Sequence, residues 1–298
     1  MKIPRISSDY INIYKPRADV YLGKSSKHLV QGITYEHWIP NDHLFIKGDD
    51  HRWHGYGITH PYLPEMEDDI HEAEWQSFHC VSPKGSLKDF LTTESFEDHQ
   101  KILYPQTRPN ESEAQHAPAI VKKDNLWHMF YGPETIRYAT STDLFNWQAK
   151  GGVFTDHQSS RDPHIYYENG TYYLTYCRET SVMTRTSTDL LHFSEPTEIF
   201  SMRRSGNPES PVLLKHEDYY YLLWCIWDET EEKPDPYDAR TFVYASKNPL
   251  DFKSAPQVAS LYGHAPEIIV DEDGDYFITS AHKPFVGINI AHLEWIQY

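Results

Sequence analysis

A short motif built around proline recurs four times along the chain and constrains the fold more than any other feature. Its copies are His116-Ala117-Pro118-Ala119-Ile120, Asp162-Pro163-His164-Ile165, Glu209-Ser210-Pro211-Val212 and His264-Ala265-Pro266-Glu267-Ile268. Successive prolines are 45, 48 and 55 residues apart, and an aromatic residue follows each proline by 9 or 10 positions. Spacings of this size are typical of proteins built from repeated structural units.

Each repeat unit is predicted to form β-hairpins. Residues 165–167 and 171–176 are rich in β-branched and aromatic side chains, and the Asn169-Gly170 pair between them is typical of a hairpin turn. Long helical periodicity is absent, and the 22 Tyr, 8 Trp and 20 Pro favour strands and loops over helices. About four strands per unit, repeated around an axis, form a β-propeller.

A weaker fifth copy of the motif lies upstream. Asn41-Asp42-His43 is followed by an apolar run, a polar turn and Trp53, with His43 in the place of the proline. We therefore predict an all-β protein, a five-bladed β-propeller that forms one domain over residues 1–298, with blades starting near residues 41, 116, 162, 209 and 264. Residues 1–40 lack the motif, and we expect residues 21–23 and 38–40 to supply a strand that closes the ring. Residues 60–115 are expected to complete the first blade and to carry a long loop.

Composition excludes several classes of function. A formal net charge of −17 argues against binding to nucleic acids or anionic membranes. No run of 18 or more apolar residues, the length of a membrane-spanning helix, is present.

The first nine residues lack the apolar core of a signal peptide, so we expect a cytoplasmic protein unless a leader has been removed. Cys80, Cys177 and Cys225 are expected to be buried, reduced thiols. The oligomeric state is not indicated.

The ionisable residue beside the proline changes from copy to copy while the surrounding residues repeat. Asp42, Asp162 and Glu209 are expected at equivalent points of three blades, where the innermost strands start at one mouth of the central channel. Carboxylates that converge there repel each other, and this raises the pKa of at least one of them. A protonated acid beside an ionised one is what cleavage of a glycosidic bond requires.

These residues resemble the five-bladed glycoside hydrolases of family 43, with relatives in families 32, 62, 68 and 117. The matching elements lie between residue 41 and about residue 282 and are Asp42, Asp162-Pro163, Glu209-Ser210-Pro211 and His264. The resemblance implies an inverting glycosidase in which Asp42 is the general base, Glu209 is the general acid, and Asp162 raises the pKa of Glu209. We expect exo-action on a short oligosaccharide.

The resemblance also indicates how the rest of the site is used. It implies no required cofactor, although His264 would line a channel that in relatives can hold a hydrated calcium or sodium ion. A histidine can serve as the acid in family 117, so His116, His164 and His264 are alternatives to Glu209 in that role. The candidates for contact with the sugar are His43, Trp53, His116, Arg161, His164, His264 and Glu267.

Two other functions are compatible with the sequence. A phosphorolytic enzyme of related fold would use one acid and a basic phosphate site, for which Arg161, Arg203 and Arg204 are candidates. A non-catalytic propeller that binds a sugar would have little use for three mutually repelling acids. No His-Glu-x-x-His motif or paired-cysteine spacing predicts a zinc site. The sequence does not indicate the sugar, the linkage or the anomer.

Overall fold

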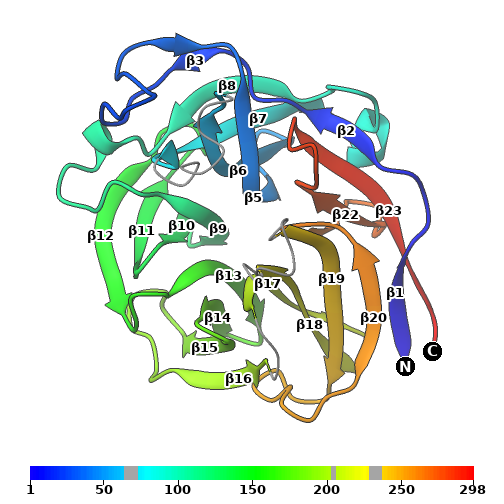
Figure 1. The fold of residues 1–298 in the computed structure, drawn as a ribbon. Helices are drawn as coiled ribbons and strands as arrows, with labels where there is room; N and C mark the ends of the chain where they lie inside the picture. Colours follow the sequence, from blue (N-terminus) through cyan, green and yellow to red (C-terminus); the bar gives the residue numbers. More distant parts are fainter. Residues whose placement is uncertain (64–72, 203–205, 228–236) are drawn as a thin grey trace.

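The computed structural model describes residues 1–63, 73–202, 206–227 and 237–298, and it confirms the predicted five-bladed β-propeller (Figure 1). Each blade is an antiparallel sheet whose first strand is the innermost. The described residues contain only short 3₁₀ helices, η3 (Leu87–Phe90) and η4 (Pro105–Thr107). None of the described segments is a helix long and apolar enough to cross a membrane.

The strands of each blade follow one another in the sequence, except in the last blade. Blade one contains β5 (Trp38–Lys47), β6 (Arg52–Pro61), β7 (Gln76–Lys84) and β8 (Glu97–Ile102). Blade two contains β9 (His116–Lys123), β10 (Leu126–Gly132), β11 (Thr135–Ser141) and β12 (Gln148–Thr155). Blade three contains β13 (Arg161–Glu168), β14 (Thr171–Arg178), β15 (Ser181–Ser187) and β16 (Thr197–Ser201). Blade four contains β17 (Asn207–His216), β18 (Tyr219–Trp227), β19 (Tyr237–Ser246) and β20 (Gln257–Tyr262).

The fifth blade joins the two ends of the chain. It contains β21 (Glu267–Val270), β22 (Tyr276–Ser280) and β23 (Ile288–Gln297), with β1 (Lys2–Ile6) as its outer strand and β2 (Ile11–Tyr14) also paired to β23. The predicted closure by residues 21–23 or 38–40 is therefore wrong. Residues 38–40 begin the innermost strand of blade one, and β3 (Asp19–Val20) pairs with β4 (Thr34–Tyr35) outside the ring.

Apolar clusters between neighbouring blades hold the ring together. One cluster between blades five and one contains Phe45, Phe78 and Phe277, and comparable clusters occupy the other four contacts between blades. Burial of such side chains is the main favourable term in folding, at roughly 25 cal/mol per Å² of apolar surface. All three cysteines are free and buried, as expected.

The hairpin turn predicted at Asn169-Gly170 is present, and a second turn of the same kind joins β9 to β10. Asp124 and Asn125, which join β9 to β10, have φ angles of 49° and 61°, and Asn169 and Gly170 have φ angles of 49° and 83°. Two consecutive residues with positive φ define the type I′ turn that matches the twist of paired strands. These turns lie at the end of the inner strands opposite the proline motifs.

Candidate active site

The proline motifs place irregular backbone at one mouth of the central channel. The pairing of the innermost strand with its neighbour shifts by one residue at the motif in blades one to four. The residue before the proline has a left-handed backbone in all four copies, with φ angles of 34° at Ala117, 55° at Asp162, 47° at Ser210 and 48° at Ala265. This conformation costs a non-glycine residue on the order of 1 kcal/mol, and such backbone strain gathers at functional sites.

The strand register changes the alignment of the three predicted carboxylates. Arg161 and Glu209 occupy equivalent positions in blades three and four, so Glu209 lies one residue before the position of Asp162. In blade one, Asn41 aligns with Asp162, and Asp42 takes the place of the proline. The expectation that the three acids occupy equivalent strand positions is therefore wrong. Each acid nevertheless lies at the register shift of the innermost strand of its own blade.

A narrow cavity lies where the five blades meet. Its volume is about 20 Å³, which is enough for about one water molecule. Every blade contributes to its wall: Asp42, His43, Ala117, Pro118, Asp162, Pro163, Ser210, Pro211, Ala265, Pro266 and Glu267. The sequence motif is thus the segment of each blade that faces the channel.

Ser210 joins two of the predicted carboxylates. Its hydroxyl donates a hydrogen bond to Oδ1 of Asp42, and its main-chain N–H donates to Oδ2 of Asp162 over 3.2 Å. The backbone of Asp42 on β5 closely approaches Gly57 on the neighbouring strand β6, because a Cβ atom at position 57 would lie 2.7 Å from the carbonyl oxygen of Asp42. A side chain at position 57 would displace this part of the mouth.

Arg161 joins Asp162 to the third carboxylate, Glu209. Its guanidinium lies 3.5 Å from Oδ2 of Asp162 and 3.7 Å from Oε1 of Glu209, and it donates a hydrogen bond of 3.0 Å to the carbonyl oxygen of Pro208. A buried cation between two carboxylates reduces their mutual repulsion. The structure therefore brings Asp42, Asp162 and Glu209 together through one serine and one arginine.

The two acids with predicted catalytic roles have raised pKa values. Burial raises the pKa of Asp42 to about 7, and the charge of Asp162 adds to this shift, whereas the hydrogen bond from Ser210 opposes it. Burial also raises the pKa of Glu209 well above its usual range, and the charge of Arg161 opposes that shift. The charges of Asp162 and Asp42 raise the pKa of Glu209 further. A carboxyl group with a pKa of about 7, such as that of Asp42, can exchange protons near neutral pH, and a raised pKa keeps an acid such as Glu209 protonated to higher pH, as general acid–base catalysis requires.

A fourth acid at the site was not found from the sequence. Glu74 is 3% exposed, and its Oε2 lies 3.0 Å from Nε2 of His116. Its charge raises the pKa of both Asp42 and Glu209. Glu74 precedes β7 and lies in none of the repeated motifs, so periodicity could not reveal it. The pairing with Glu74 places His116 beside the carboxylates, where it was predicted.

Two of the other predicted histidines hold neighbouring blades together. Nε2 of His43 lies 2.8 Å from the hydroxyl of Thr279 in blade five, and burial lowers the pKa of His43 to about 3. Nδ1 of His164 accepts a hydrogen bond of 3.4 Å from the main-chain N–H of Leu213 in blade four, and burial lowers the pKa of His164 to about 4. Both are neutral imidazoles that already have protein partners.

The remaining predicted residues differ in their position. His264 is 1% exposed and lies beside Glu209, whereas Glu267 lines the narrow channel cavity, where burial and the charge of Asp42 raise its pKa to about 8. Trp53 pairs with Lys47 at the opposite end of blade one and is 5% exposed within the apolar cluster between blades. The predicted stacking of Trp53 on a sugar is therefore wrong, because its ring is part of the core. Arg203 and Arg204 lie outside the described residues.

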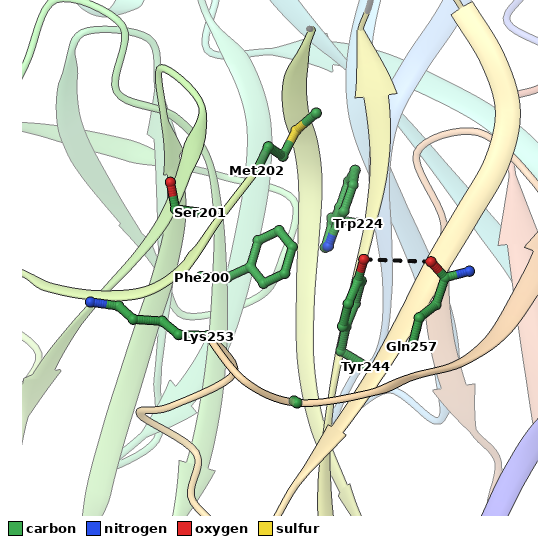
Figure 2. A pocket seen from close by; sticks show the side chains of 8 residues that line it. Phe200, Ser201, Met202, Trp224, Tyr244, Lys253 and Gln257 are labelled. Atoms are coloured by element: carbon green, nitrogen blue, oxygen red, sulfur yellow. Dashed lines mark hydrogen bonds between the residues drawn. The ribbon is translucent and has the colours of Figure 1, made fainter. Parts of the chain in front are cut away.

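A second, larger pocket lies at the outer edge between blades three and four (Figure 2). Its volume is about 310 Å³, and it is lined by Phe200, Ser201, Met202, Trp224, Tyr244, Lys253, Ala255 and Gln257. None of these lining residues is a carboxylic acid or a histidine. The described lining of this pocket therefore offers no pair of carboxylic acids, and we assign the candidate active site to the mouth of the channel.

Solved structures similar to this protein include glycoside hydrolases. A thermostable family-43 glycoside hydrolase has a TM-score of 0.64 and 16% identity, over 92% of this chain and 93% of that one. An arabinanase from Bacillus subtilis has a TM-score of 0.62 and 16% identity, over 87% and 94%. An exo-1,5-α-L-arabinanase from a bovine ruminal metagenomic library has a TM-score of 0.59 and 15% identity, over 87% and 94%. At these identities the likeness supports the fold.

The family is shown by the sequence itself. No curated protein sequence matches the chain, but residues 91–257 match the profile of the glycosyl hydrolases of family 43. The matched segment includes Asp162 and Glu209, and it ends before His264 and begins after Asp42. Because this match covers more than half of a chain that folds as a five-bladed propeller with carboxylates at its mouth, the chain belongs to glycoside hydrolase family 43 and is a glycosidase.

Proposed function

We propose that this glycosidase hydrolyses an oligosaccharide with inversion of configuration, with Asp42 as the general base and Glu209 as the general acid. The observation that carries the proposal is the convergence of Asp42, Asp162 and Glu209 from three blades on one mouth of the channel. Three acids at one point cost folding energy, and acid–base catalysis is the function that uses them.

The proposed reaction needs two proton transfers. Asp42 takes a proton from a water molecule that attacks the anomeric carbon, and Glu209 gives a proton to the leaving glycosidic oxygen as the bond breaks. The hydrogen bond from Ser210 favours the ionised form of Asp42. The charge of Asp162 favours the protonated form of Glu209. The raised pKa of Glu209 thus suits its role as an acid, whereas the hydrogen bond from Ser210 only partly offsets the burial that favours protonated Asp42.

The substrate that we propose first is a pentose oligosaccharide. The structural neighbours include arabinanases, and one of these is named as an exo-1,5-α-L-arabinanase. Exo-action on a short chain of α-1,5-linked arabinose is therefore the first case to test. The catalytic groups proposed are side chains, so the reaction needs no organic cofactor.

The test is a product analysis over oligosaccharides that contain pentose, galactose or anhydrogalactose. Proton NMR during the first minutes should show the anomer opposite to that of the substrate, released as a monosaccharide. Release of the same anomer would contradict the inverting mechanism, and longer fragments would contradict exo-action. Formation of a sugar 1-phosphate only with added phosphate would favour the phosphorolytic alternative.

A further inference from the structure

Glu209, Cys225 and His264 bring a carboxyl group, a thiol and an imidazole together beside the channel mouth. One ligand atom from each lies within 4.8 Å of the other two. Glu209 is on β17, Cys225 is on the neighbouring β18, and His264 precedes β21 in the next blade. Glu209 and Cys225 are 16 residues apart in the sequence, and Cys225 and His264 are 39 apart. The three residues therefore do not form a short sequence motif for metal binding.

The surrounding structure holds these three side chains in place. Glu209 and Cys225 are cross-strand neighbours, and the thiol lies 3.7 Å from the main-chain oxygen of Glu209. The main-chain N–H of His264 donates a hydrogen bond of 2.9 Å to the hydroxyl of Ser280, and its ring packs edge-on against Phe285. The cluster therefore needs little rearrangement to bind an ion.

We infer that Glu209, Cys225 and His264 bind a borderline-soft divalent cation such as Zn²⁺, and that the bound cation inhibits hydrolysis. Zn²⁺ takes four ligands from thiolate, imidazole and carboxylate groups, and a site with three protein ligands keeps the fourth position for water. The side chain of Glu209 is 17% exposed, so the site is open toward solvent on that side.

The same donors do not fit the hydrated calcium ion that the family resemblance implies near His264. Calcium prefers six to eight oxygen ligands, whereas this cluster offers one carboxylate together with sulfur and nitrogen. The adjoining channel cavity, at about 20 Å³, has room for about one water molecule. The thiol of Cys225 thus changes the kind of ion that this part of the site can hold.

Binding of the cation releases protons. Cys225 binds the ion as a thiolate and Glu209 as a carboxylate, so each passes to solvent the proton that it holds in the metal-free protein. The two anionic ligands balance the charge of the cation. Because protons compete with the ion for these ligands, the affinity is expected to increase with pH.

Inhibition follows because the metal takes the proton-donating oxygen of Glu209. This consequence rests on the catalytic role proposed for Glu209, whereas the binding itself does not. Binding and hydrolysis can therefore be measured separately. A metal-free protein that hydrolyses no glycoside would contradict the proposed function, and an active protein that binds no Zn²⁺ would contradict this inference.

The experiment uses the full chain, freed of metal, with Zn²⁺ as the probe. Calorimetry should show one ion per chain, with tighter binding at pH 8 than at pH 6, and hydrolysis should fall in parallel and recover with a chelator. Cys225→Ala should weaken both binding and inhibition by at least about 100-fold. Cys177→Ala is the matched control, because Cys177 is equally buried and lies opposite Arg161 as Cys225 lies opposite Glu209.

A second measurement does not depend on the folding of a variant. Co²⁺ in place of Zn²⁺ should give the wild-type protein a thiolate-to-metal charge-transfer absorption band, which is retained in Cys177→Ala. Absence of this band would overturn the inference. Equal Zn²⁺ affinity in Cys225→Ala and the wild type would also overturn it.

Discussion

The hydroxyl of Ser210 in blade four donates a hydrogen bond to the carboxylate of Asp42 in blade one, across the mouth of the channel. Hydrogen bonds to an ionised carboxylate stabilise the charged form and lower its pKa. The main-chain N–H of Ser210 donates a second hydrogen bond, to the carboxylate of Asp162. A residue that the motif alignment treated as scaffold therefore contacts two of the three acids.

Replacement of Ser210 by alanine should shift the pH dependence of the reaction. Loss of the hydroxyl removes a contact that lowers the pKa of Asp42, so the acidic limb of kcat/KM should move to higher pH by up to about one unit. Activity should fall several-fold near pH 6 and recover near pH 8. Ser181→Ala, which breaks a hydrogen bond to Glu198 away from the mouth, is the control. A uniform loss at every pH would contradict this role.

The leaving group should separate the roles of Glu209 and Asp42. Glu209→Gln should reduce kcat on a natural oligosaccharide by about 10³-fold, or about 4 kcal/mol in the barrier. An aryl glycoside with an acidic phenol needs no protonation, so the same variant should hydrolyse it with little loss. Asp42→Asn should lose activity on both substrates, because the attack of water is impaired in each. Equal losses for Glu209→Gln on both substrates would remove Glu209 from the acid role.

The central part of the fold could be predicted because its signal is local and repeated. Each proline motif, inner strand and hairpin lies within one short segment, and the pattern returns in each blade. The closing strand gave no such signal, because β1 is only Lys2–Ile6 and pairs with residues 293–297 at the other end of the chain. Pairing between the two ends of a chain depends on the completed ring, which a local sequence pattern does not encode.

The candidate site was predicted in part for the same reason. Asp162 and Glu209 lie in clear copies of the motif, whereas Asp42 lies in a copy without proline and shifts by one position in the strand register. Glu74 lies outside every copy, and its place at the site is shown only by its contact with His116 in blade two. Trp53 follows the first copy of the motif, and its sequence position does not distinguish a ring that contacts sugar from one in the core. Only the three-dimensional structure shows that its ring packs between blades.

Glu74 should affect the positions of both the acidic and the alkaline limb in the pH dependence of kcat/KM. Its charge raises the pKa of Asp42 and of Glu209, so Glu74→Gln should move the acidic and the alkaline limb of kcat/KM to lower pH together, each by less than about one unit. Glu179→Gln is the matched control, because Glu179 also faces a histidine, His157 at 3.5 Å, but on the exposed surface. A shift of only one limb would show that Glu74 acts on a single acid.

The pH dependence of the free energy of unfolding should show that ionisation of Asp42 destabilises the folded protein. Its pKa is about 7 in the folded protein against a usual value of 3.8, so the folded state holds a proton that the unfolded chain has already lost between these values. The loss of folding stability caused by ionising Asp42 is therefore absent below about pH 4, grows as the pH rises, and is complete above about pH 7. Asn at this position removes the titration and should stabilise the protein by about 2–4 kcal/mol at pH 8 and by little at pH 4. Urea unfolding of Asp42→Asn and the wild type across this range measures the difference, with the exposed Asp218→Asn as control. A difference in unfolding free energy that does not depend on pH would show that ionisation of Asp42 does not destabilise the folded protein.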